Sequence, residues 1–232
     1  MNSNLRWKFR FVLGLTLVRA PLIVLFLGVS VCVDQPLPAR WFVVALGAMA
    51  LSAVSDLFDG YFARRFGVAS RLGSYADPLT DKIFYLTTFP TVIYLAARAG
   101  QYRHARVLLL LAILFLLRDQ WVSFLRSLGA LHNLDAKANW SGKARTVVSF
   151  PTICAIYYFL EAPAGWGPKV PIVAIYGLEI LSMAINLISI AVYTGQFWTA
   201  LRTELRPPAQ SRPPGNENRH AEIDTGPVKG VN

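Results

Sequence analysis

The 232-residue chain has a formal net charge of +10, yet only 16% of its residues are charged and 54% are hydrophobic. With a mean hydropathy of +0.42, this composition argues against a soluble globular domain, which would carry more charge and shorter apolar runs. The basic residues concentrate in alternate loops between apolar runs, a pattern typical of membrane proteins. Nucleic acid is therefore not an expected partner.

Six apolar runs follow one another along the chain, and a helix needs roughly 20 such residues to cross lipid. Because only helices and closed barrels satisfy all backbone polar groups in lipid, runs this continuous predict helices. The expected fold class is all-α, a polytopic membrane protein with six transmembrane helices. The predicted spans are Phe11–Val33, Trp41–Phe58, Leu79–Ala97, Val107–Leu128, Thr146–Leu160 and Val170–Gly195.

The first ten residues alternate bulky apolar side chains with Arg6, Lys8 and Arg10. This pattern suits the headgroup layer and predicts an N-terminal interfacial segment. Most other basic residues fall on the side of the N-terminus, which the positive-inside rule assigns to the cytoplasm. We expect a multi-pass integral protein of a bacterial-type inner or cell membrane. One basic cluster on the opposite side departs from the rule: Arg98, Arg103 and Arg106.

Four aspartates occur where the second predicted span ends and the third begins. Their spacings of three and four residues place each pair on one helical face. Converging carboxylates repel one another unless cations neutralise them, and oxygen-only ligands favour magnesium, manganese or calcium over zinc. Such a metal pair at the membrane surface suits a phosphate or pyrophosphate group. The aspartates are Asp56, Asp59, Asp77 and Asp81.

Small residues accompany this acidic cluster. Gly60 and Ala63 leave room for a backbone or ligand to approach, and Arg64 is a natural partner for a phosphate. The simpler interpretation is a pair of solvated helix ends, where the helix dipole favours an aspartate. That interpretation accounts for Asp56 or Asp77 alone, but not for four carboxylates at paired helical spacing.

The stretch from Asp56 to Asp81 resembles the signature D-x2-D-G-x2-A-R-x8-G-x3-D-x3-D of the CDP-alcohol phosphatidyltransferase family at every fixed position. The resemblance implies six spans, two divalent cations (Mg or Mn), an active site on the cytoplasmic side and a possible homodimer. It also implies transfer of a phosphatidyl group from CDP-diacylglycerol to an alcohol, with release of CMP. The lipid bilayer is thus an expected partner.

The same resemblance assigns roles to individual residues. It implies that all four aspartates are metal ligands and that Asp81 is also the general base for the attacking hydroxyl. The residues implied to bind the CDP-lipid are Asp56, Gly60, Ala63, Arg64 and Gly73.

Three further stretches resemble phosphatidylglycerophosphate synthases within the family, with some substitutions: residues 77–82, 118–126 and 141–146. The implied acceptor is glycerol 3-phosphate. Arg118 lies inside a predicted span, where an unpaired cation is costly and usually functional. A salt bridge with Asp119 is the alternative for Arg118, and ordinary membrane anchoring is the alternative for Lys143 and Arg145. The candidate ligands of the acceptor phosphate are Arg118, Lys143 and Arg145.

Residues 11–205 are expected to form one membrane domain, after the interfacial segment 1–10. A disordered cytoplasmic tail is expected over 206–232, which is rich in proline, glycine and polar residues. Cardiolipin-, phosphatidylserine- or inositol-type acceptors stay open within the family. An ion or solute transporter is the alternative of another class, and it would place its acids near the midplane or in repeated halves.

Overall fold

The structure is a computed structural model that describes residues 3–68, 71–132, 134, 140–168 and 170–205; it describes no side chains for residues 3–5, 56–57, 71–78, 81 and 143. Within these ranges every regular element is a helix, which confirms the all-α prediction. The predicted tail 206–232 lies outside the described residues. The helices are α1 (Ser3–Cys32), α2 (Ala39–Phe66), α3 (Arg71–Arg98), α4 (Tyr102–Leu131), α5 (Trp140–Glu161), α6 (Ile172–Gln196) and α7 (Trp198–Glu204).

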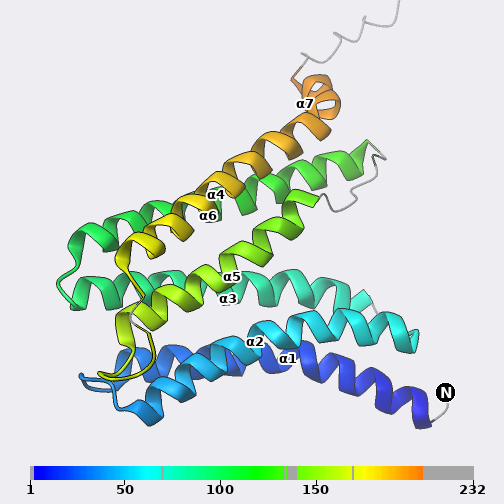
Figure 1. Ribbon diagram of the computed structural model, residues 1–232. Helices are drawn as coiled ribbons and strands as arrows, with labels where there is room; N and C mark the ends of the chain where they lie inside the picture. Colours follow the sequence, from blue (N-terminus) through cyan, green and yellow to red (C-terminus); the bar gives the residue numbers. More distant parts are fainter. Residues whose placement is uncertain (1–2, 69–70, 133, 135–139, 169, 206–232) are drawn as a thin grey trace, which may run out of the picture.

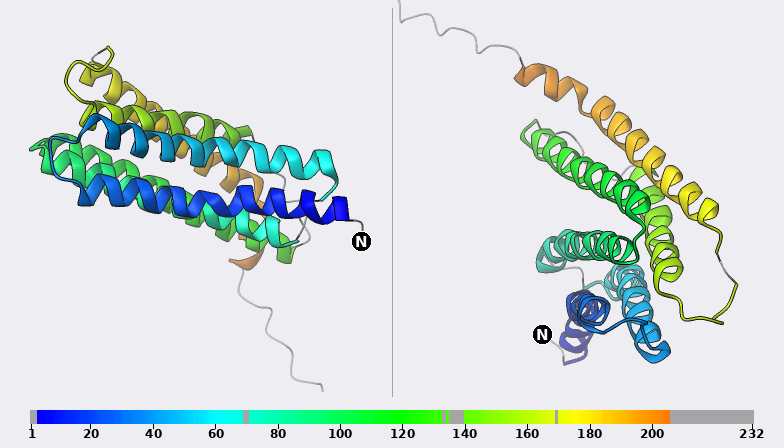
Figure 2. Two further views of the ribbon diagram at one scale, coloured as in Figure 1. Left: turned by 90° about the horizontal axis from the view of Figure 1, so that it is seen from below. Right: turned by 90° about the vertical axis from the view of Figure 1, so that its left-hand side faces the viewer.

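The six long helices run back and forth between two ends of one bundle (Figure 1). The end that we call the N-terminal end carries the N-terminus, the α2–α3 and α4–α5 connections, and α7. The opposite end, which faces the viewer in the right-hand view of Figure 2, carries the other three connections. Every long helix therefore has one terminus at each end.

Two groups of three helices make up the bundle. α1 packs against α2 and α3, whereas α6 packs against α4 and α5, and α3 joins the groups through α4 and α5. The main core lies toward the opposite end, where the Tyr157 ring contacts the rings of Phe26 and Phe42 at centroid distances of 5.1 and 5.9 Å. Toward the N-terminal end the two groups diverge (Figure 1).

The helices have the character of membrane spans. Over the described residues, four of them are long and apolar enough to cross a membrane: α1 from Arg6, α2, α4 and α6. α3 and α5, with 28 and 22 residues, do not reach this criterion. α1 begins at Ser3, so the described part of the predicted interfacial segment continues directly into the first apolar run.

The helices that carry the aspartates are longer than the predicted spans. α2 continues beyond Phe58 to Phe66, and α3 begins at Arg71, so both aspartate pairs lie within helices. The end of α2 is set by Gly67 instead, which adopts a left-handed conformation (φ 63°) and donates its N–H to the Arg64 carbonyl. Backbone capping, and not the fall in hydrophobicity at the aspartates, therefore marks the end of this helix.

The short helix α7 is fixed to α4 at the N-terminal end. Phe197, at the junction of α6 and α7, is buried against Gly129, where an added Cβ would overlap its ring. His132 Nε2 and Glu204 Oε1 lie 2.9 Å apart, which adds a polar contact between the two helices. The chain after α6 therefore leaves the bundle beside the end of α4.

Candidate active site

Asp59 joins α2 to α1. Its buried carboxylate accepts a hydrogen bond from the Thr16 hydroxyl at 2.8 Å, and the Arg19 guanidinium lies 3.9 Å from the same oxygen. Thr16 and Arg19 are one helical turn apart, so one face of α1 supplies both groups. The second aspartate of the signature is thus held by polar groups deep in the bundle, not solvated at a helix end.

Arg64 lies back along α2 over Gly60. A Cβ at position 60 would stand 3.3 Å from Arg64 Nη1, closer than an ordinary van der Waals contact. The absent side chain therefore leaves space for the guanidinium on the surface of the helix, one turn from Asp59. Ala63, half-buried on the same helix, adds little bulk beside it.

Several predicted site residues are placed only by the helix to which they belong. Asp56 belongs to α2, Gly73, Asp77 and Asp81 to α3, and Lys143 to α5, but their side chains or surroundings lie outside the described part of the chain. The roles implied for these five residues therefore stay predictions.

Arg118 and Arg145 come together at a single carboxylate. Asp119 Oδ1 lies 2.6 Å from Arg145 Nη1 and 3.3 Å from Arg118 Nη1. The salt bridge considered for Arg118 is therefore present, and it extends across to α5. Two buried cations share one acid, so this group retains a positive charge that an anionic ligand would complement.

α6 supplies further partners that the sequence did not suggest. The Ser189 hydroxyl accepts hydrogen bonds from Nε and Nη2 of Arg118, at 2.9 and 2.6 Å. The Tyr193 hydroxyl accepts one from Arg126 at 2.9 Å, and its ring lies 5.4 Å from the Arg118 guanidinium. A Cβ at Gly142 would stand 3.1 Å from that hydroxyl, so the start of α5 packs closely against Tyr193. Residues of three helices thus orient Arg118.

Span six carries a signal for these contacts in its spacing. Its buried polar residues recur every three or four positions in an otherwise apolar helix, which places them on one face. Buried polar groups within a membrane helix need partners in the protein. The stripe comprises Glu179, Ser182, Asn186, Ser189 and Tyr193.

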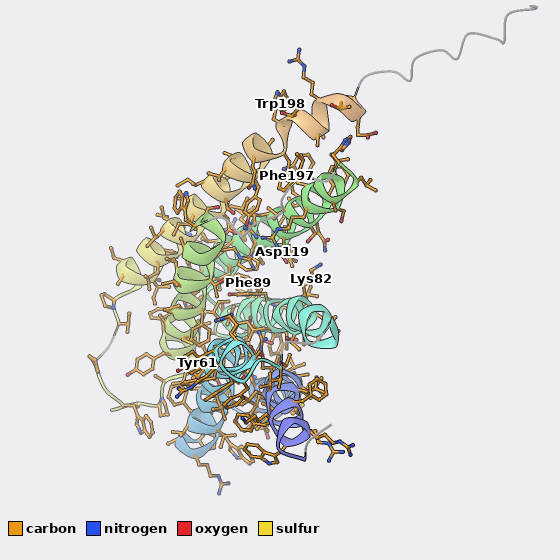
Figure 3. All side chains as sticks on the ribbon, turned by 90° about the vertical axis from the view of Figure 1, so that its right-hand side faces the viewer. Tyr61, Lys82, Phe89, Asp119, Phe197 and Trp198 are labelled. Atoms are coloured by element: carbon orange, nitrogen blue, oxygen red, sulfur yellow. The ribbon has the colours of Figure 1, made fainter. Side chains whose placement is uncertain are left out.

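Arg145 also connects the basic residues to α3. Its guanidinium lies 4.1 Å from the centroid of the Phe115 ring and 5.4 Å from that of the Tyr85 ring. Its Nε is buried without a hydrogen-bond partner among the described residues. Figure 3, viewed from the N-terminal end, shows Lys82 pointing from α3 toward the side of α4 that carries Asp119. The two groups of helices therefore meet here.

The donor chemistry of the acidic cluster fits a hard cation. The Asp59 carboxylate lies beside the Thr16 hydroxyl and the Arg19 guanidinium, and the other three signature positions on α2 and α3 are also aspartates. Among the described side chains, no group of three or more metal-type ligands occurs; only one of the four aspartates is in that set. Oxygen ligands of this kind suit magnesium or manganese.

The chain is similar in sequence to known enzymes that share one name. The chain is 29% identical over 180 residues to the CDP-diacylglycerol–glycerol-3-phosphate 3-phosphatidyltransferase of Shigella flexneri, covering 76% of this chain and 90% of that protein. It is 29% identical over 166 residues to the enzyme of that name from Mycoplasma pneumoniae, covering 69% of each. A rice chloroplast enzyme of the same name, numbered 1, is 51% identical over 44 residues, which is 19% of this chain and 13% of that protein.

The family model for CDP-alcohol phosphatidyltransferase matches residues 13–199, which include all six long helices in whole or in large part. This range contains both the acidic positions of α2 and α3 and the basic residues of α4 and α5. The chain belongs to the CDP-alcohol phosphatidyltransferase family, and it is a membrane enzyme that transfers a phosphatidyl group.

Proposed function

We propose that the protein transfers the phosphatidyl group of CDP-diacylglycerol to glycerol 3-phosphate, which yields phosphatidylglycerophosphate and CMP. The names of the relatives that match most of the chain support this acceptor. The buried arginines support it independently, because an acceptor with its own phosphate needs a second anion site beside that for the pyrophosphate.

The position of Arg145 carries the proposal. Its guanidinium lies against Tyr85 of α3, and Tyr85 is one helical turn beyond Asp81. Positions four residues apart share a helical face, so the basic residues adjoin the part of α3 that holds the last signature aspartate. An acceptor phosphate at Arg118 and Arg145 would thus have its hydroxyl end within reach of the CDP-lipid site.

At the CDP-lipid site, Asp56, Asp59, Asp77 and Asp81 would hold two divalent cations. When bound, Mg or Mn would neutralise the pyrophosphate and stabilise the charge that develops as CMP leaves. Arg64 would bind a phosphate oxygen, and the small residues Gly60, Ala63 and Gly73 would let the CDP group approach the helices.

At the acceptor site, Arg118, Lys143 and Arg145 would bind the phosphate of glycerol 3-phosphate, and that phosphate would replace Asp119 as partner of the arginines. Asp81 would accept the proton of the acceptor hydroxyl. The hydroxyl oxygen would then form a bond to the phosphorus attached to diacylglycerol, as the bond from that phosphorus to the CMP oxygen breaks.

We also infer that all six long helices cross the membrane. The shortest, α5, has 22 residues, and at 1.5 Å per residue it reaches about 33 Å, against about 30 Å for the hydrocarbon layer. The N-terminal end of the bundle would face the cytoplasm, with residues 1–10 at the interface, residues 11–205 as one domain and 206–232 as a tail. A homodimer remains a prediction.

A purified-enzyme assay tests the acceptor. The full chain, in detergent micelles with labelled CDP-diacylglycerol, is supplied in turn with glycerol 3-phosphate, phosphatidylglycerol, serine and inositol. We expect CMP release that requires both glycerol 3-phosphate and magnesium or manganese. Release with one of the other alcohols alone would reject this acceptor, and no release with any alcohol would favour the transporter alternative.

A further inference from the structure

A cavity with basic residues in its lining lies at the opposite end of the bundle from the candidate active site. Its volume is about 810 Å³, and it is lined by the connection before α4, by the first turns of α4 and α6, and by Phe159 of α5. Figure 2 (right) shows this end of the helices toward the viewer. We call it the α4–α6 cavity.

The cavity is cationic. Arg103 and Arg106 line it and are exposed, and its lining contains no acidic residue. Within the described residues no carboxylate pairs with either arginine, whereas Arg98, the third basic residue of the cluster, pairs with Glu161 at 3.3 Å. Two of the three arginines that depart from the positive-inside rule therefore face a cavity without a counter-charge.

A buried polar contact between α4 and α6 holds the walls of the cavity together. His104 lines it from α4, and its Nε2 lies 2.7 Å from Glu179 Oε1 of α6, with both side chains almost fully buried. The Gln101 side chain is within 3.3 Å of His104 Nδ1. Glu179 is fully buried and does not line the cavity, so its carboxylate does not contact a ligand there.

The cavity lies at the depth of lipid headgroups. α4 and α6 qualify as membrane spans from Tyr102 and Ile172 onward, and these same residues line the cavity. Tyr102 and Tyr176 supply aromatic rings with hydroxyl groups, which are favoured at the membrane interface. The lining thus combines cations with an apolar wall. It complements an anionic lipid, in which a negatively charged headgroup adjoins apolar acyl chains.

We propose that the α4–α6 cavity binds the phosphate of an anionic phospholipid in the leaflet opposite the candidate active site. Arg103 and Arg106 bind the phosphate, and Phe159 and Ile172 contact the glycerol and the upper acyl chains. This site is independent of the phosphatidyl transfer at the other end, so it does not depend on which alcohol is the acceptor.

Native mass spectrometry of the purified full chain tests this site, with dioleoyl-phosphatidylglycerol as the probe and dioleoyl-phosphatidylcholine as the neutral comparison. We expect the Arg103→Gln/Arg106→Gln double variant to bind phosphatidylglycerol about tenfold more weakly than the unaltered chain. The Arg103→Lys/Arg106→Lys variant keeps the charge and should retain most of the affinity. CMP release by all variants should stay within about twofold, which also shows that they fold.

Matched controls separate this site from general attraction to charge. Arg40→Gln removes an exposed arginine at the same end but outside the cavity, and it should leave lipid binding unchanged. An equal loss in Arg40→Gln, no loss in the double variant, or equal binding of both lipids would overturn the proposal. Displacement of the lipid by millimolar glycerol phosphate would assign the cavity to a soluble phosphate and would equally reject the lipid.

Discussion

The acidic positions on α2 and α3 and the basic residues on α4 and α5 differ in how the chain assembles them. The four aspartates fall within residues 56–81, on two consecutive helices. The arginines meet through Asp119, and Arg118 is oriented by Ser189, 71 residues further along the chain. One continuous signature therefore identifies the first region, whereas the second combines separate stretches whose side chains meet only through the packing of three helices.

This difference has a consequence for function within the family. A region encoded by one continuous stretch is expected to keep the chemistry common to all members. A region assembled from separate helices can change its ligand by substitutions at scattered positions, because each contact is adjusted independently. We therefore expect the α1–α3 group to govern the CDP-lipid and the α4–α6 group to govern the acceptor.

The largest effect is expected at the acidic region. Asp81→Asn should lower kcat about 1,000-fold, because it removes both the proposed proton acceptor and a charged cation ligand. Binding of CDP-diacylglycerol should largely persist and is measured by equilibrium binding with the labelled lipid. Asp34→Asn, an exposed change at the opposite end, is the matched control. Undiminished turnover in Asp81→Asn would refute the role as base.

Arg118→Gln tests the basic region. The loss of a charge-assisted contact to phosphate should lower kcat/KM for glycerol 3-phosphate about 10- to 100-fold, mainly through KM. The KM for CDP-diacylglycerol should stay unchanged, and steady-state kinetics with each substrate varied in turn measures both. Arg202→Gln, exposed on α7, controls for loss of surface charge.

Arg64→Gln should produce the reverse pattern, with a raised KM for CDP-diacylglycerol and an unaltered KM for glycerol 3-phosphate. If either variant raised both KM values equally, the division of substrates between the two helix groups would be wrong.

The difference between the acidic and the basic region also explains how much of this enzyme the sequence predicts. The signature from Asp56 to Asp81 identifies the reaction because its residue types and spacing are specific to the family. The sequence misplaces the end of α2 because hydropathy falls at the aspartates, while the helix continues to its glycine cap at Gly67. The spacing of the polar residues on α6 marks one face that includes Ser189, but the sequence does not say which helix that face meets, and only the packing brings Ser189 to Arg118.

Ser189→Ala should have a smaller effect than loss of the arginine. Without the hydroxyl, Arg118 keeps its charge but loses the acceptor of two hydrogen bonds, so KM for glycerol 3-phosphate should rise about three- to tenfold with kcat unchanged. Ser189→Thr should restore most of the affinity. Ser182→Ala, two turns earlier on the same face of α6, is the matched control. A fall in kcat without a change in KM would contradict a positioning role.

Gly60→Ala should have the smallest effect and a mixed one. Alanine in place of a helical glycine stabilises α2 by about 1 kcal/mol, measured by thermal unfolding. The added methyl group displaces the Arg64 guanidinium and narrows the approach to the helix, so KM for CDP-diacylglycerol should rise about threefold. Gly47→Ala, where nothing lies within 4 Å of the added atom, should stabilise the protein without changing KM.

The contact between Gly129 and Phe197 bears on how this sequence can diverge. Any side chain at position 129 would occupy the space of the Phe197 ring, and without that ring a glycine at 129 would leave a void. Neither position can change alone without cost, so they should covary: relatives that have lost the glycine should carry a smaller residue in place of the phenylalanine. An alignment of relatives would then show the attachment of α7 to α4 as a linked pair of columns.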